Sequence, residues 1–255
     1  MGDALGKIAW FFIRVVARMI ILAIDTATDA VSVALHDGDG VIATSESRSE
    51  RQHAELLTPM IDFVCKQANL TLQDVGAVAV DVGPGLFTGM RVGIASAQAI
   101  AHVLELPMAA ITSLDALSAE VPSTLDVVAS VIDARRGEVY WSLYRRVDGV
   151  LRQVAAPQVG SVEQCAVEII DRGQSTTLVG TGALQYQDEF DQRLSTVLPE
   201  VEFADEKFSM PSATTIATLA HELALRDMLV DVDAIVPLYL RAPDAEINWA
   251  TRSAS

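Results

Sequence analysis

The fold of this chain is decided by the stretch Gly83-Pro84-Gly85-Leu86-Phe87-Thr88-Gly89-Met90-Arg91-Val92-Gly93. It follows residues 77–82, which are typical of a buried strand, and it opens into a helical pattern that ends near Leu104. Glycines at such a strand-to-helix turn let the backbone approach a neighbour closely, either a phosphate or a packed segment of chain. The motif lacks the ending of a Walker A loop and misses the dinucleotide fingerprint by one residue. We therefore favour a tight turn that positions a packed helix over a phosphate site.

Two helices are predicted beside this turn. Residues 88–104 are almost all apolar or small, which is typical of a helix that is buried nearly all round. The helix over residues 51–68 carries one apolar stripe that a sheet can cover, formed by Leu57, Ile61, Val64 and Ala68. A second stripe lies roughly 100° around the cylinder and consists of His53, Leu56, Met60 and Phe63. We expect the second stripe to pack on the helix at 88–104, on a partner chain, or on both.

The composition bounds the function classes. The chain has 255 residues, of which 51% are apolar, and this allows two modest cores in an α/β protein with two lobes. Its net charge of -16 argues against a grip on nucleic acid by this chain alone, because such affinity depends on Lys and Arg that neutralise phosphates. Cys65 and Cys165 lack metal-ligand spacing, so we expect free buried thiols in a reducing cytosol.

Residues 1–18 are treated as an N-terminal extension. Ile8 to Val16 is apolar, but the basic residues in and around it leave the run too short to span a bilayer, which takes about 20 apolar residues. A secretory signal is not predicted, because no small-residue cleavage site follows. The segment is either a short helix on a membrane surface or an upstream extension of a chain that starts at Met19, and we favour the second interpretation.

A repeat in the sequence indicates two lobes. Ile24-Asp25 and Ile132-Asp133 each end an apolar strand, and each is followed by the same order of turn, strand, turn and strand. Duplicated lobes are the economical explanation. The predicted segments are a first lobe at 19–120, a second, smaller lobe at 121–240, an amphipathic helix at 211–228 that is free to pack back on the first lobe, and a polar tail at 241–255.

Little reactive chemistry is assembled in the sequence. Asp25 ends a strand before two threonines, so this turn can either hold Mg²⁺ through water beside a phosphate or make turn hydrogen bonds only. We favour the second interpretation, and the candidate phosphate-proximal residues are Asp25, Thr26, Thr28, Gly83 and Gly85. The four histidines lack metal-ligand spacing, and no Gly-x-Ser-x-Gly nucleophile motif is present. The sequence therefore predicts no metal ligands and no catalytic residues.

Several motifs together resemble the TsaB family, formerly called YeaZ. They are Ile21-Leu22-Ala23-Ile24-Asp25-Thr26, Arg51-Gln52-His53-Ala54-Glu55-Leu56-Leu57-Thr58-Pro59, the Gly83 motif, Asp133-Ala134-Arg135-Arg136-Gly137-Glu138-Val139-Tyr140 and Tyr239-Leu240-Arg241. The resemblance implies the two-lobed actin-like ATPase fold of the acetate and sugar kinase, chaperone and actin superfamily, an α/β fold with a duplicated mixed sheet flanked by helices. It also implies a cytoplasmic role, without membrane contact, in the bacterial complex that makes N6-threonylcarbamoyladenosine in tRNA.

The resemblance further implies a non-catalytic subunit. In this family catalysis belongs to the paralogue TsaD, which binds a metal through a His-x-x-x-His motif, and here Ser113 and Leu117 occupy the two histidine places. Neither side chain can replace imidazole as a metal ligand. We therefore expect no cofactor on this chain alone, with ATP or ADP and a metal held by partner subunits or at a shared interface.

The implied partners are TsaD, which this chain would activate, and the ATPase TsaE, which it would help to dock. tRNA would be reached only through the complex, and a homodimer through the same helices is the alternative pairing. The helices at 51–68 and 88–104 resemble those of a four-helix contact in the family. The implied contact residues are His53, Leu56, Pro59, Met60, Phe63, Phe87, Thr88, Arg91, Val92 and Ala95.

Two other functions compete with this interpretation. A small-molecule kinase of the same superfamily would use Asp25 and would need an adenosine pocket in the second lobe, for which Gly180-Thr181-Gly182 is a faint candidate. A metalloprotease, a label attached to this superfamily, would need the missing histidine pair. We favour the non-catalytic subunit over both.

Overall fold

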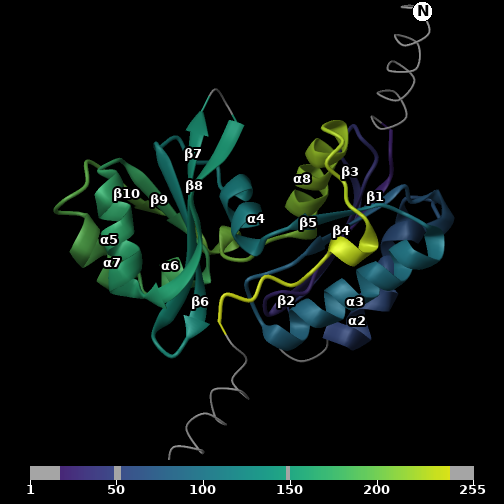
Figure 1. Cartoon of the computed structure of the whole chain (residues 1–255), viewed down its shortest axis with the longest axis horizontal. Helices are drawn as coiled ribbons and strands as arrows, with labels where there is room; N and C mark the ends of the chain where they lie inside the picture. Colours follow the sequence, from purple (N-terminus) through teal and green to yellow (C-terminus); the bar gives the residue numbers. More distant parts are fainter. Residues whose placement is uncertain (1–17, 49–52, 148–149, 242–255) are drawn as a thin grey trace, which may run out of the picture. The chain divides into compact units, whose positions relative to one another are not determined.

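The computed structural model describes residues 18–48, 53–147 and 150–241 (Figure 1). The chain divides into two compact units: the first runs to Ala116 and takes in Pro211–Pro237, and the second comprises Leu117–Met210 and the residues from Leu238 on. Among the described residues no helix is both long and apolar enough to cross a membrane. The predicted N-terminal extension and polar tail lie outside the described residues, apart from Arg18 and Arg241.

A five-stranded mixed sheet forms the centre of the first unit. Its strands follow the order β3-β2-β1-β4-β5, in which β1, β2 and β3 pair antiparallel while β1, β4 and β5 pair parallel. Short turns join the antiparallel strands, whereas a helical connection precedes each parallel strand, as parallel pairing requires. The strands are β1 (Ile21–Asp25), β2 (Ala30–His36), β3 (Val41–Arg48), β4 (Ala77–Asp81) and β5 (Met108–Ile111).

Helices cover both faces of this sheet (Figure 1). Alternate side chains of a strand point to opposite faces. Leu22 and Ile24 therefore join the core under α2 and α3, while Ile21 and Ala23 join the core under α8. Burial on both faces explains the unbroken apolar sequence of β1. The helices here are α2 (His53–Gln67), α3 (Phe87–Leu104), the first half of α4 (Ser113–Glu120) and α8 (Ala213–Leu225), with short 3-10 helices η1 (Leu72–Asp74) and η3 (Val232–Ala234).

The second unit repeats this plan. Its sheet has the order β8-β7-β6-β9-β10, which matches β3-β2-β1-β4-β5 strand for strand, and the parallel and antiparallel pairings correspond. The predicted duplication of a mixed sheet flanked by helices is thus confirmed. The elements are β6 (Val127–Arg135), β7 (Glu138–Val147), β8 (Val150–Ser161), α5 (Val162–Arg172), β9 (Thr176–Val179), α6 (Thr181–Gln185), α7 (Gln187–Leu194), β10 (Val201–Phe203) and η2 (Glu206–Phe208).

Residues 211–237 follow the second sheet in sequence but belong to the first unit. The helix predicted at 211–228 is α8, and its buried residues Ile216, Ala217 and Ala220 lie in one core with β1. The helix thus packs on the first unit, as the prediction for 211–228 had allowed, and the second unit lacks this segment. The first stretch of the first unit ends at Ala116 rather than at residue 120. The physical reason is that an amphipathic helix packs on whichever sheet face is uncovered, and its own sequence does not say which sheet that is.

Candidate functional site

The turn after β1 and the Gly83 motif pack directly against each other. Leu86 N donates a hydrogen bond to Ala27 O at 2.7 Å, and the Thr26 hydroxyl donates to Gly89 O at 2.8 Å. Both bonds join residues that are about 60 positions apart in sequence. They hold the first turn of α3 on the end of β1.

Three glycines allow this close contact. A Cβ atom would lie 2.1 Å from Ala27 O at Gly85, 2.1 Å from Thr26 O at Gly89, and 2.3 Å from Thr26 Oγ1 at Gly93. No side chain fits at such distances. The neighbour that these glycines approach is therefore a packed segment of the chain, as their spacing favours.

The candidate phosphate-proximal residues lie inside the first unit. The exposed fraction is 0% for Asp25, 1% for Thr26 and 7% for Thr28. Gly83 N already donates to the Asp81 carboxylate, at 2.6 Å. A phosphate role for this set stays a prediction, because its side chains are buried and most of its polar groups are engaged within the unit.

Two buried carboxyls end β1 and β4. These strands are parallel, and Ile24 lies opposite Val80, so Asp25 and Asp81 are the next neighbours across the sheet. Burial raises the pKa of both groups; the charge of Asp81 raises the pKa of Asp25 further, and the pKa of Asp81 reaches about 7. Asp25 was predicted from the sequence as a candidate site residue, whereas Asp81 was not. The signal was available, because residues 77–81 end an apolar strand on Asp as residues 21–25 do.

Helix α4 begins at the place where the resemblance puts the two lost metal ligands. The Ser113 hydroxyl donates to Asp81 Oδ1 at 2.8 Å, and Leu117 is fully buried. Ser113 therefore helps to position Asp81. Within the three described ranges, no group of three or more His, Cys, Asp or Glu side chains is arranged to hold a metal ion.

The sides of α2 and α3 that point away from the sheet form a surface, here called the α2–α3 face. Both helices pack on the same side of the sheet and touch each other (Figure 1). Phe63 on α2 is 48% exposed and Val103 on α3 is 78% exposed. Of the predicted contact residues, Pro59, Phe63, Thr88, Arg91 and Ala95 are exposed, and Leu56, Phe87 and Val92 are half-buried.

Two predicted contact residues are instead buried in the chain's own structure. His53 Nε2 donates to Thr28 O at 2.8 Å, and Met60, which is 7% exposed, lies in the core under α2. The second stripe is thus divided between the core and the surface. The reason is that a helix that packs on a sheet buries a wide sector of its circumference. Part of the second stripe falls within this buried sector, and the rest faces away from the sheet.

Helix α3 is also not buried nearly all round, contrary to the sequence-based prediction. The sheet covers only one side of it. The small residues Ala95 and Ala99 lie on the side that faces away from the sheet, where they are exposed. Its exposed residues are Thr88, Arg91, Ala95, Ala99, His102 and Val103.

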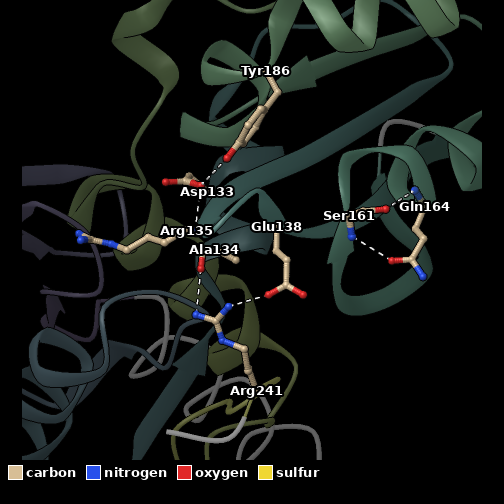
Figure 2. Close-up of polar contacts among 8 residues, drawn as sticks. All are labelled: Asp133, Ala134, Arg135, Glu138, Ser161, Gln164, Tyr186 and Arg241. Carbon is tan, nitrogen blue, oxygen red and sulfur yellow. Dashed lines mark hydrogen bonds and ion pairs between the residues drawn. The ribbon is translucent and has the colours of Figure 1, made fainter. Parts of the chain in front are cut away.

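Figure 2 shows the polar contacts of the turn between β6 and β7 in the second unit. Asp133 accepts from the backbone N–H two residues further on, as Asp25 does from Ala27 N. Asp133 Oδ1 accepts hydrogen bonds from Arg135 N at 2.9 Å and from the Tyr186 hydroxyl at 3.4 Å. Thr181 Oγ1 accepts from Asp133 N at 3.1 Å. The carboxylate of Asp133 is therefore occupied with holding its own turn.

Arg241, from the last motif of the resemblance, braces the same turn. It donates to Ala134 O at 2.9 Å and to Glu138 Oε2 at 2.7 Å (Figure 2). Two motifs that are about a hundred residues apart in the sequence thus meet in one contact. Their role in this unit is structural.

The segment Gly180-Thr181-Gly182 packs on the end of β6 as the Gly83 motif packs after β1. A Cβ atom would lie 2.3 Å from Val131 O at Gly180 and 2.9 Å from Ile132 C at Gly182. These glycines serve the approach of α6 to the strand. They do not favour the adenosine pocket that the kinase alternative needs.

Comparisons with known proteins agree with this architecture. A family model described as TsaD, tRNA N6-adenosine threonylcarbamoyltransferase, matches residues 36–249. The tRNA threonylcarbamoyladenosine biosynthesis protein TsaB of Escherichia coli is 33% identical over 88% of this chain and 95% of its own length. An uncharacterized protein of Mycobacterium leprae is 37% identical over 89% of this chain, which spans only 56% of that relative.

Two solved structures are similar over their whole length. YeaZ from Pseudomonas aeruginosa has a TM-score of 0.71 and 29% identity over 87% of this chain and 100% of its own. An uncharacterized protein described as similar to peptidase YeaZ from Pseudomonas aeruginosa has a TM-score of 0.76 and 30% identity over 88% and 100%. The duplicated β3-β2-β1-β4-β5 sheet with its covering helices defines an α/β protein of two similar units, the arrangement expected from the resemblance to the actin-like ATPase fold. Within that class, the chain belongs to the TsaB (YeaZ) family.

Proposed function

We propose that this chain is the non-catalytic subunit of a bacterial complex that makes N6-threonylcarbamoyladenosine in tRNA, and that it pairs with and activates the paralogous transferase TsaD. The observation that carries the proposal is the α2–α3 face, where apolar side chains are exposed on two neighbouring helices. The name of the Escherichia coli relative supports the pathway, and the description of the family model supports the kind of partner.

The start of α4 supports a role without catalysis. Ser113 and Leu117 stand where the resemblance places metal-binding histidines in TsaD, and neither is a metal ligand. The Ser113 hydroxyl is engaged by Asp81, and the two carboxyls beside it are closed off from solvent. We therefore assign ATP or ADP and the metal to the partner subunits or to a shared interface.

The α2–α3 face fits a related subunit better than it fits nucleic acid. Its exposed side chains include the apolar Phe63 and Val103, and the positive charge of Lys66 is paired with Asp62. The guanidinium of Arg91 lies 3.8 Å from the centre of the Phe87 ring. A net charge of -16 opposes independent binding of RNA. tRNA is then reached through the complex in the cytoplasm, without a membrane, and TsaE docks on the assembled pair. A homodimer through the same face is the competing assembly.

Placing charges in the face tests the proposal. In the double variant Phe63→Asp, Ala95→Asp, both replaced side chains are exposed, so the isolated chain should keep its fold. Pairing with TsaD should weaken about 100-fold or more, because buried unpaired charges are costly in an interface. Co-expression with the TsaD paralogue followed by size-exclusion chromatography measures the pairing.

The matched control is Val197→Asp, because Val197 is 57% exposed, belongs to the second unit and is not part of the α2–α3 face. The control should pair with TsaD like the wild type. Undiminished pairing of the double variant contradicts the assignment of the face. A tRNA modification assay with each subunit omitted tests the other half, since transfer of a threonylcarbamoyl group by this chain alone would contradict a non-catalytic role.

A further inference from the structure

Asp25 and Asp81 form a buried acidic pair that the proposed function does not use. They are 0% and 1% exposed, and they end neighbouring strands in register, about one strand spacing of 4.8 Å apart. Both continue the alternation of Ala23 and Ala79, which lie in the core under α8. The two carboxyls therefore start from the same face of the sheet.

Each carboxyl has one engaged oxygen and one orphaned oxygen. Asp81 Oδ1 accepts from Gly83 N at 2.6 Å and from the Ser113 hydroxyl at 2.8 Å, and Asp25 Oδ1 accepts from Ala27 N at 2.8 Å. The Oδ2 atoms of both residues are buried without a hydrogen-bond partner. A buried carboxylate oxygen without a donor is strongly unfavourable.

The groups around Asp25 and Asp81 make it unfavourable for both carboxyls to be ionised at the same time. Glu46 on β3 and Asp115 on α4 add negative potential. The adjacent start of α8, where Ala213 N donates to Ser32 beside Asp25, carries no charged residue in its first turn. On the opposite side of the turn, the ring of His53 is directed at Thr28 O. Two neighbouring buried carboxyls in such surroundings cannot both ionise at neutral pH.

We propose that Asp25 and Asp81 share one proton between their orphaned oxygens, and that this proton stabilises the contacts between α3 and the ends of β1 and β4 in a pH-dependent way. We call this shared proton the lock. Asp81 already has two donors, which favour its charged form, so Asp25 carries the proton and donates it to Asp81. One shared proton satisfies both orphaned atoms.

The lock connects to the α2–α3 face through short chains of contacts. Gly83 opens the loop before α3 and is held by Asp81; Ala27 is held by Asp25 and in turn accepts from Leu86 N at 2.7 Å. When the proton leaves, repulsion between two carboxylates strains the contacts that seat α3. Weaker pairing with TsaD at high pH is a consequence that rests on the proposed function, whereas the proton sharing does not.

Thermal unfolding across neutral pH tests the lock. The folded pKa values of both carboxyls lie above their ordinary value of 3.8, so the stabilisation is complete below that value. It is lost as pH rises, first as Asp81 ionises near its pKa of about 7 and then as Asp25, whose pKa is raised as well, gives up the shared proton. The unfolding temperature of the wild type should fall by about 5 °C between about pH 6 and about pH 9. Asp81→Asn supplies a permanent amide donor and should remove most of this fall. The control Glu222→Gln, an exposed residue on α8, should keep it.

A second measurement needs no folded variant. Carbon-13 NMR of the aspartate carboxyls in the wild type should show one buried carboxyl that titrates near neutral pH. If every aspartate titrates below about pH 5, as ordinary carboxyls do, the lock is rejected. An equal fall in unfolding temperature in Asp81→Asn and in the wild type also rejects it.

Pairing with TsaD at the two pH values separates the two proposals. The affinity should drop about tenfold between about pH 6 and about pH 9 in the wild type and less in Asp81→Asn. If the two aspartates titrate near neutral pH but the affinity for TsaD does not change with pH, the link between the lock and the α2–α3 face is rejected and the lock itself is not. Failure of the charge variants in the α2–α3 face would reject the proposed function without affecting the titration.

Discussion

At Gly89 a hydrogen atom occupies the place where any other residue would put a carbon 2.1 Å from Thr26 O. The absence of a side chain lets α3 sit directly on the turn after β1, and the Thr26 hydroxyl donates to Gly89 O from the same turn. The position of α3, and with it half of the α2–α3 face, therefore depends on this residue. Spacing along the sequence identified the glycine motif because the glycines cluster at a strand-to-helix turn, but the residue that Gly89 approaches lies about 60 positions away.

We expect Gly89→Ala to lower the free energy of unfolding by about 2 kcal/mol, because the backbone of the turn cannot yield as a flexible side chain would. Gly40→Ala is the control, since nothing lies within 4 Å of a Cβ atom at Gly40. That change should stay within about 0.5 kcal/mol of the wild type. Urea unfolding followed by circular dichroism measures both. Equal stability of the two variants would mean that the turn tolerates a shift of α3.

At the scale of elements, α8 is held against β2 by an aromatic contact as well as by its apolar stripe. The rings of His36 on β2 and His221 on α8 stack at 4.8 Å between centroids, and both side chains are buried. His36 Nδ1 accepts from Gly38 N at 2.9 Å, which requires the nitrogen to be unprotonated. The stacked arrangement of the two imidazole rings is favourable when both are neutral, because two positive charges at this distance would repel each other.

This contact predicts a loss of stability in acid. Burial, and next the proximity of His221, lower the pKa of His36 below 6.5, against a smaller opposite effect of Asp37 and Asp39. The stabilisation is therefore present above about pH 6.5 and is lost as pH falls through the folded pKa. The urea midpoint should fall between about pH 7.5 and about pH 5, and His221→Phe should reduce that fall. His102→Gln, at an exposed position of α3, should leave it unchanged.

At the scale of the whole molecule, two units with the same strand order are built from one chain that carries a net charge of -16. The excess of carboxylates repels itself in any compact state. The exposed ion pairs in the described residues, such as the one between Lys66 and Asp62, contribute little against this repulsion. Net charge therefore affects the stability and solubility of the chain but not its topology.

Salt should accordingly stabilise the isolated chain. Raising sodium chloride from about 0.01 M to about 0.15 M shortens the screening length from about 30 Å to about 8 Å, and the unfolding temperature should rise by a few degrees. Differential scanning calorimetry measures the change, with sucrose of equal osmolarity as the uncharged comparison. A fall of the unfolding temperature with salt would indicate that favourable ion pairs outweigh the general repulsion.

Three features could be predicted from the amino-acid sequence alone: the strands that end at Asp25 and Asp133, the duplicated order of elements, and the tight glycine turn of the Gly83 motif. Strand period, turn chemistry and the missing side chain of glycine act within a short segment, so they can be read along the chain. Helical spacing also placed Phe63 in a second apolar stripe, and the resemblance added Pro59; both are exposed in the structure.

The contacts between distant residues could not be predicted from the sequence and followed from the folded chain. It paired Asp81 with Asp25, directed His53 at Thr28 and buried Met60, returned α8 to the first unit, and joined Arg241 to Glu138. These outcomes depend on how strands order themselves in a sheet and on which apolar face each helix finds uncovered. Both are properties of the assembled chain, and no single segment carries them.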